Sequence, residues 1–198
     1  MRKLKLQMQM SLDGFVSTGP NDEQKWVTWA LGDIYQHVLG LLDSIDTIII
    51  GRKLAIDYIP FWQDVLTQPD HEMYGFAQRI VAAKKIIFTK TLDKSIWDNT
   101  ELAKGDMAEE IKKLKSQGGK NLPTGQAGMI VYGGTSFVAS LIKEGLIDEL
   151  HFFVNPVVLG KGESIFSSLE EFHYLKLKKA VAYNSGIVLL IYENNQRK

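Results

Sequence analysis

Three stretches of this chain place glycine, hydroxyl or basic residues directly after an apolar run. These residues are Gly51, Arg52, Lys53, Thr89, Lys90, Gly133, Gly134, Thr135 and Ser136. Arginine and lysine bind phosphate oxygens, and glycine lets a phosphate approach the backbone N–H groups at the start of a helix. A simple turn is the alternative for each stretch, because the chain has neither a Rossmann G-x-G-x-x-G motif nor a P-loop. Together the three stretches favour a phosphate-bearing ligand.

A second group of polar residues lies near the N-terminus. Gln7 and Gln9 alternate with apolar residues between Lys3 and Met10, so they share one face of a predicted strand. If the strand is central in a sheet, two uncharged amides there indicate a polar pocket with donors and acceptors. The alternative is an edge strand with solvated glutamines, because Lys3 and Lys5 share that face.

Asp33 and Trp29 are further candidates for contact with a substrate. Asp33 lies early in a helix predicted over 29–44, and a positioned carboxylate can assist proton transfer to a substrate. A helix-capping role after Gly32 explains Asp33 equally well. Trp29 can stack on a flat ring, with core packing as its alternative.

Composition and spacing exclude several other classes of protein. The chain has no cysteine, and its four histidines are dispersed, so we expect no metal. No G-x-S-x-G elbow supports a serine hydrolase. Lys plus Arg and Asp plus Glu both number 23, which argues against nucleic acid as a partner. No apolar run approaches the ~20 residues of a membrane helix, and we expect a cytoplasmic protein.

The elements that must position these residues alternate along the chain. Strands are predicted over 3–10, 46–50, 84–89, 127–132 and in the segment after 148, with helices over 29–44, 71–83, 106–115 and from 135. Asn184-Ser185-Gly186 separates two final β-like runs and predicts a hairpin. The pattern is typical of an α/β protein with one mixed, mostly parallel sheet, helices on both faces and a C-terminal antiparallel hairpin. Ligands of such sheets bind at the carboxyl ends of the strands.

Five segments of the chain occur in the order and spacing of one known family. They are SLDGFV, IIIGRK, IIFTKTL, VYGGTSFVASLIKEGLIDEL and VNPVVLGKGESIF. The chain resembles the dihydrofolate reductase-like family, which includes the C-terminal reductase domain of the bacterial riboflavin-biosynthesis deaminase-reductase. The resemblance covers almost the whole chain and implies a single domain of that fold over residues 1–198.

The resemblance implies that NADPH is the cofactor. Gly51, Arg52, Lys53, Thr89 and Lys90 would hold the 2′-phosphate and nearby pyrophosphate, and the stretch from Gly133 to Ser136 would cradle the pyrophosphate. The loop from Ser11 to Val16 would cover the nicotinamide, with Asp13 and Gly14 shaping its turn. Substrate would meet Gln7, Gln9, Asp13, Trp29 and Phe153, and Asp33 would be catalytic. Leu54 departs from the family, which often has a hydroxyl residue there.

The implied function is an NADPH-dependent reductase that transfers hydride to a small heterocycle. The resemblance is to 5-amino-6-(5-phosphoribosylamino)uracil reductase of riboflavin biosynthesis. No deaminase domain precedes it, so a stand-alone enzyme with a pterin-like substrate is an alternative. A nucleotide-binding protein without turnover is another. The family's habits also indicate a homodimer formed through the C-terminal strands.

Overall fold

The computed structural model describes residues 1–19, 22–123 and 125–195, and the chain forms two compact units. The first unit contains residues 1–4 and 36–134, and the second contains residues 5–35 and 135–198. Pro20, Asn21 and Thr124 of the predicted loops, and residues 196–198 of the polar tail, lie outside the described residues.

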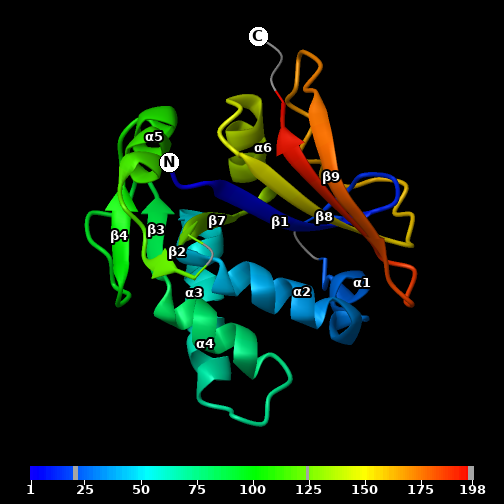
Figure 1. Cartoon of the computed structure of the whole chain (residues 1–198), viewed down its shortest axis with the longest axis horizontal. Coiled ribbons are helices and arrows are strands. Elements are labelled where there is room, and N and C mark those ends of the chain that lie inside the picture. The colour runs from blue at the N-terminus through cyan, green and yellow to red at the C-terminus, as the bar shows by residue number, and fades with distance from the viewer. Residues whose placement is uncertain (20–21, 124, 196–198) are drawn as a thin grey trace. The chain divides into compact units, whose positions relative to one another are not determined.

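The first unit is built on a parallel sheet. Its strands are β2 (Ile45–Gly51), β3 (Lys84–Phe88), β4 (Thr100–Ala103) and β7 (Gly128–Tyr132), in the order β4-β3-β2-β7 (Figure 1). β2 pairs in parallel with β3 and with β7, and β3 pairs in parallel with β4. Ile48–Ile50 and Met129–Val131 have no exposed surface. Continuous burial of this kind is typical of parallel strands that are covered on both faces.

Helices α3 (Arg52–Leu66), α4 (Tyr74–Ala82) and α5 (Met107–Ser116) belong to the first unit. α3 packs against α4 and contacts β2 and β3. α5 begins where the Asp106 carboxylate accepts the backbone N–H of Glu109 at 3.1 Å, an N-cap that explains its start. The Gly-rich excursion after α5 contains the short pair β5 (Asn121–Leu122) and β6 (Gly125–Gln126).

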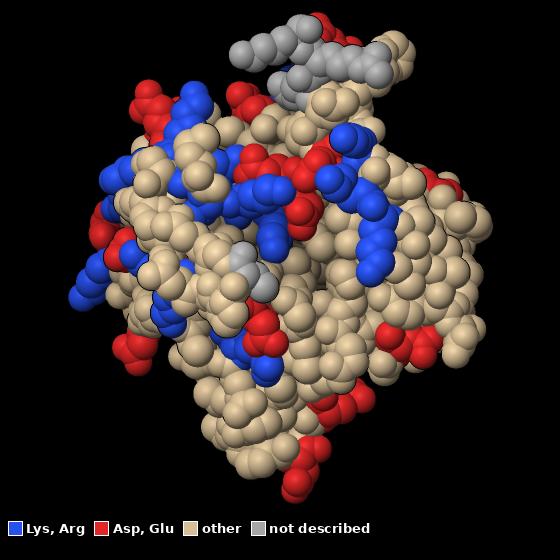
Figure 2. Space-filling model, in the orientation of Figure 1, with Lys and Arg blue, Asp and Glu red and all other residues tan. Residues whose placement is uncertain are grey.

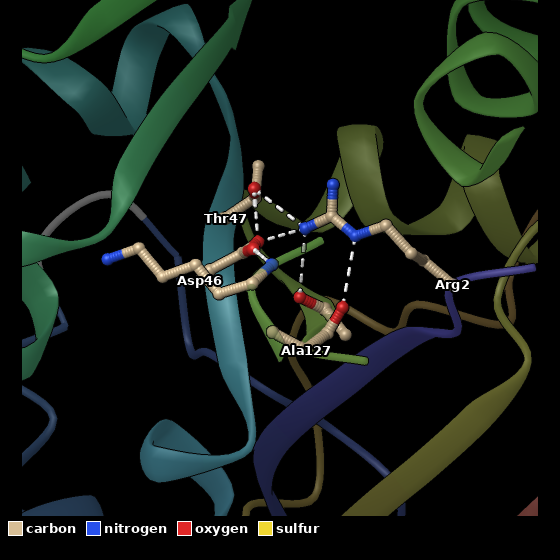
Figure 3. A network of polar contacts seen from close by, with 6 residues as sticks. Arg2, Asp46, Thr47 and Ala127 are labelled. Carbon is tan, nitrogen blue, oxygen red and sulfur yellow. Dashed lines mark hydrogen bonds and ion pairs between the residues drawn. The ribbon is translucent and has the colours of Figure 1, made fainter. Parts of the chain in front are cut away.

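A buried arginine ties the N-terminus into this unit (Figure 3). The Arg2 Nε donates to the Ala127 carbonyl at 3.0 Å, and its Nη2 donates to Thr47 Oγ1 at 2.9 Å and pairs with Asp46. The side chains of Arg2 and Asp46 are only 5% and 11% exposed. Burial lowers the pKa of Arg2, and the Asp46 carboxylate opposes that effect. The network therefore joins the first residues of the chain to β2 and to the segment before β7.

The second unit contains a mixed sheet. Its order is β1 (Leu4–Ser11), β8 (Glu149–Asn155), β10 (Val188–Asn194) and β9 (Leu175–Ala182). β1 pairs with β8 in parallel, whereas β10 pairs with β8 and with β9 antiparallel. The turn between β9 and β10 closes with Gly186 at φ 88°. Helices α1 (Lys25–Thr28) and α6 (Thr135–Lys143) lie in the same unit, and α2 (Leu31–Asp43) has residues in both.

These findings confirm the mixed, mostly parallel sheet and the C-terminal hairpin. The helix predicted over 29–44 is present as α2, which begins two residues later, at Leu31, and is preceded by the separate four-residue helix α1. Sequence patterns missed α3, which contains Pro60, a residue that usually breaks a helix interior, and the four-residue strand β4. One domain over 1–198 stays a prediction.

The surface fits the balanced composition. On the face in Figure 2, basic and acidic side chains lie intermixed. None of the described helices is long and apolar enough to cross a membrane. The homodimer stays a prediction, and the edge strand β9 carries Lys176, Lys178 and Lys179, a charge pattern that discourages edge-to-edge strand pairing.

Candidate functional site

The carboxyl ends of three parallel strands of the first unit lie at one edge of its sheet. Gly51 at the end of β2 is in register with Phe88 at the end of β3, and Ile50 is in register with Tyr132 at the end of β7. The residues that follow these strands therefore leave the sheet at the same level. The strand ends that precede the three predicted stretches therefore share one edge, and phosphate binding by these stretches stays a prediction.

Cations without an acidic partner gather at this edge. Arg52 and Lys53 begin α3, and Lys90 follows β3 by two residues. Among the described residues, none forms an ion pair with Arg52, Lys53 or Lys90. The N-cap Gly51 is extended, at φ −75° and ψ 144°, and supplies no side-chain cap. The first N–H groups of α3 add positive potential to that of the three side chains.

The side chains of Thr89 and Leu54 already interact with other parts of the protein. The Thr89 hydroxyl oxygen accepts the backbone N–H groups of Thr91 and Leu92, both at 3.1 Å, so it shapes the turn that carries Lys90. Leu54 packs against the buried cluster that contains Ile50 and Ala55. A phosphate in this region would therefore rely on the cations and the backbone.

Gly134 occupies open space at the end of β7. A Cβ atom built on it would meet no atom within 4 Å, and its φ lies outside the left-handed region. Neither packing nor backbone geometry therefore requires glycine at this position. The chain continues directly into Thr135 and Ser136, the first residues of α6.

Two partly buried tyrosine side chains lie close to the same strand end. The rings of Tyr58 and Tyr132 are 5.5 Å apart between centroids. Burial raises the pKa of both side chains well above the ordinary range. They are neutral packing groups that support the end of β7.

At the start of α6, in the second unit, a carboxylate lies where an anion is expected. The Thr135 hydroxyl donates to Glu163 Oε2 at 2.5 Å. The N-terminus of a helix favours negative charge, so Glu163 uses part of this potential. A pyrophosphate that bound at Thr135 would have to displace the Glu163 side chain. Ser136 is exposed.

The loop after β1 is bound to the loop after β8. The Leu12 N–H donates to the Val157 carbonyl at 2.8 Å, and the Val16 N–H donates to the Glu163 carbonyl at 2.9 Å. Ser17 and Glu163 form a β-bridge. Val16 itself is only 7% exposed, so its side chain packs inward.

Asp13 fastens these two loops together. Its Oδ2 accepts the Gly160 N–H at 2.7 Å and its Oδ1 accepts the Leu159 N–H at 3.2 Å. The hydrogen bond with the Ser11 side chain, followed by the backbone bonds, lowers the pKa of Asp13 despite desolvation. Gly14 turns the chain at φ 85°. The turn-shaping role predicted for Asp13 and Gly14 is visible here, and a substrate contact of Asp13 stays a prediction.

The candidate substrate residues of the second unit differ in exposure. Gln7 and Gln9 are half-buried, Trp29 is 53% exposed, and Phe153 is fully buried, so its ring offers no surface to a ligand. The Trp29 Nε1 donates to Asn155 Oδ1 at 3.1 Å, and Asn155 Nδ2 donates to Gln9 Oε1 at 2.8 Å. One amide therefore joins two of the predicted residues.

Asp33 is exposed and holds the hairpin turn. Its Oδ2 accepts the Ser185 N–H at 2.8 Å. Burial, and then the nearby Asp33 carboxylate, raise the pKa of Tyr183. The expected capping role for Asp33 after Gly32 is replaced by this longer-range bond, and its catalytic role stays a prediction.

Sequence reasoning missed Asn155 and Glu163 as site residues. Asn155 precedes Pro156 at the end of an apolar run, a pattern that is usually attributed to a turn. Glu163 lies in a Gly-rich loop. Among the described residues, no group of three or more His, Asp or Glu side chains has the arrangement of a metal site.

Comparisons with known proteins agree with this architecture. The sequence profile of the family described as RibD C-terminal domain matches residues 2–189. A relative, uncharacterized protein YyaP of Bacillus subtilis (strain 168), is 33% identical over 198 residues, which is 98% of this chain and 96% of the relative.

Two solved structures share the fold at low sequence identity. The Thermotoga maritima diaminohydroxyphosphoribosylaminopyrimidine deaminase/5-amino-6-(5-phosphoribosylamino)uracil reductase is 16% identical, with a TM-score of 0.65 over 98% of this chain and 57% of that one. Enterococcus faecalis dihydrofolate reductase, complexed with NADP(H), is 13% identical, with a TM-score of 0.58 over 98% and 97%. The fold is therefore dihydrofolate reductase-like.

Proposed function

Because the chain belongs to the RibD C-terminal domain family, a family of reductases, we propose that it is an NADPH-dependent reductase of a small heterocycle. The proposed substrate class is that of 5-amino-6-(5-phosphoribosylamino)uracil, the compound in the name of the Thermotoga maritima enzyme. The hydride would come from NADPH, and the protein would bind, orient and shield the reactants.

The observation that carries this proposal is the group of partnerless cations in the first unit. Arg52, Lys53 and Lys90 follow strands that end in register, and no described acidic side chain pairs with them. A cluster of like charges is unfavourable unless a ligand or solvent neutralises it. A nucleotide phosphate is an anion of the right chemistry, because an arginine fork binds two of its oxygens at once.

The open space at Gly134 supports the same ligand. Protein atoms leave room for a side chain there, so an ordinary turn does not account for the glycine. A pyrophosphate that lay against the backbone of Gly133 and Gly134 would account for it, since glycine permits close approach. We therefore assign the adenosine 2′-phosphate to the cations and the pyrophosphate to the segment from Gly133 to Ser136.

Residues of the second unit would act on the substrate. Trp29 offers an exposed aromatic ring for stacking, and Gln7 and Gln9 offer uncharged amides. The Asp33 carboxylate would orient the ring and help to deliver a proton. The loop that Asp13 fastens would exclude water from the nicotinamide.

The test compares NADPH with NADH in titrations of the parent and of Arg52→Gln and Lys90→Gln. Each variant should weaken NADPH binding by roughly 1–3 kcal/mol, the scale of a hydrogen bond to a charged group. NADH lacks the 2′-phosphate, so its affinity should change much less than that of NADPH. Lys112→Gln is the matched control, because Lys112 is an exposed cation on α5 of the same unit.

Equal weakening of both cofactors would contradict the 2′-phosphate assignment. Turnover is then followed as loss of NADPH absorbance with aminouracil and with pterin substrates. Turnover of pterins alone would favour the pterin-reductase alternative. Tight NADPH binding with no turnover of either class would favour a nucleotide-binding protein.

A further inference from the structure

Asn155, the last residue of β8, is a fully buried amide with every polar atom engaged. Its Nδ2 lies 2.8 Å from Gln9 Oε1, 3.3 Å from the Phe153 carbonyl and 3.4 Å from the Met10 carbonyl. Its Oδ1 accepts the indole N–H of Trp29 at 3.1 Å. All of these residues belong to the second unit.

The chemistry of the partners determines which way the Asn155 amide points. An indole nitrogen can only donate, so the atom that faces Trp29 must be the oxygen. Backbone carbonyls can only accept, so the atom that faces Phe153 and Met10 must be the nitrogen. These independent restraints agree. Asn155 must therefore donate to Gln9.

The hydrogen bond from Asn155 determines which side-chain atoms of Gln9 remain for a ligand. Its Oε1 is used by Asn155, and among the described residues none accepts from its Nε2. The side chain is only half-buried, so the two N–H groups of Nε2 remain for a ligand or solvent. Because its oxygen is held toward Asn155, Gln9 directs its N–H donors to a ligand.

The same amide also holds Trp29. The indole is 53% exposed, and its N–H is anchored on Asn155, so the exposed ring has a preferred orientation. An anchored aromatic face with a nearby donor favours a flat ring that carries a hydrogen-bond acceptor. A ring that carries an amino group at that position would place donor against donor, which leaves both groups unpaired.

We infer that Asn155 is a positioning residue for substrate specificity. By taking the oxygen of Gln9 and the N–H of Trp29, it makes the second unit select a planar ring with a carbonyl acceptor over the same ring with an amino donor. The inference rests on the proposed function and deepens it, because it states which polarity of heterocycle the enzyme accepts.

The test uses two rings of the same shape, uracil and 2,4-diaminopyrimidine, which carry carbonyl oxygens and amino groups at the same positions. Binding is measured without NADPH, at a pH where both rings are neutral, from the side-chain N–H signals of Gln9 and Trp29 in ¹⁵N NMR spectra. The parent should bind uracil about tenfold or more tightly than 2,4-diaminopyrimidine, since a mismatched donor is left unsatisfied. The Gln9 Nε2 signal should shift with uracil.

Gln9→Glu retains an oxygen for Asn155 and replaces the donor with an acceptor. It should remove or reverse the preference. Gln78→Glu on α4 adds the same charge at an exposed amide and should leave the preference unchanged. Asn155→Ala frees the Gln9 amide to rotate and should bring the two affinities within about threefold. If Asn155→Ala does not fold, the Gln9→Glu comparison still decides the question.

A parent that binds neither ring, binds both equally or prefers 2,4-diaminopyrimidine would overturn the inference. So would a Gln9→Glu variant that keeps the parent's preference. Because NADPH is absent from these titrations, failure here leaves the cofactor assignment intact. Failure of the NADPH titrations likewise leaves this result unaffected.

Discussion

Gly119→Ala tests the Arg2 network against a matched control one residue away. A Cβ atom at Gly119 would lie 2.6 Å from the Ala127 carbonyl oxygen, 2.9 Å from Arg2 Nε and 3.2 Å from Asp46 Oδ2. At Gly118 the same atom would meet nothing within 4 Å. The two substitutions are chemically identical, so their difference reports the contact alone.

The expected cost follows from two effects. Overpacking of a well-packed site costs about 1–3 kcal/mol. The methyl group also forces apart Arg2 Nε and the Ala127 oxygen, which form a 3.0 Å bond in the parent. A hydrogen bond to a charged group contributes about 1.5–3 kcal/mol. Because the two effects share atoms, we expect a loss of about 2–4 kcal/mol in the free energy of unfolding.

The assay is urea denaturation followed by circular dichroism, with thermal melting beside it. For a chain of this size the expected loss lowers Tm by about 5–15 °C. Gly118→Ala should stay within about 0.5 kcal/mol of the parent. In an Arg2→Ala background, Gly119→Ala should cost less than in the parent, because one of the colliding groups is gone.

Equal stabilities of the Gly118→Ala and Gly119→Ala proteins would refute this reasoning. Full additivity with Arg2→Ala would show that the cost arises elsewhere.

Two further predictions concern the cofactor and the substrate. Gly134→Ala should weaken NADPH binding about tenfold or more while the Tm of the free protein changes by less than a few degrees, because the added methyl group meets the ligand and no protein atom. Thermal melting with and without NADPH measures both effects, and an undiminished increase in Tm on adding NADPH would show that the glycine serves only the turn. Asp33→Asn should lower kcat with little change in NADPH affinity, because the amide oxygen can still accept the Ser185 N–H but the charge is lost. Steady-state kinetics and cofactor titration measure the two quantities, and full turnover by the variant would leave Asp33 with its structural role alone.

Local patterns were sufficient to predict much of the fold. The apolar β-branched runs of β2 and β3 identify buried strands, because their residues need cover on both faces. The Asn184-Ser185-Gly186 turn between alternating runs predicts the β9–β10 hairpin, because such turns are short-range. Parallel strands align their carboxyl ends, and the structure accordingly places Gly51 and Phe88 in register at one edge of the sheet.

Glycine roles could not be separated in this way. Gly118, Gly119 and Gly134 look alike in the sequence, yet only Gly119 is in contact with a buried ion pair. Steric need depends on which atoms of the folded chain surround a position. Local sequence does not contain that information.

The polarity of the substrate residues also depended on tertiary structure. The sequence alone identified Gln9 as an amide with donors and acceptors, and Trp29 as an aromatic ring. Asn155 lies 146 residues from Gln9 and 126 from Trp29 in the sequence. It reaches Gln9 because β8 pairs with β1, and it reaches Trp29 because the fold brings the segment before α2 to the end of β8. A side-chain amide can donate and accept, so only the partners that the fold supplies determine which of its atoms remains for a ligand.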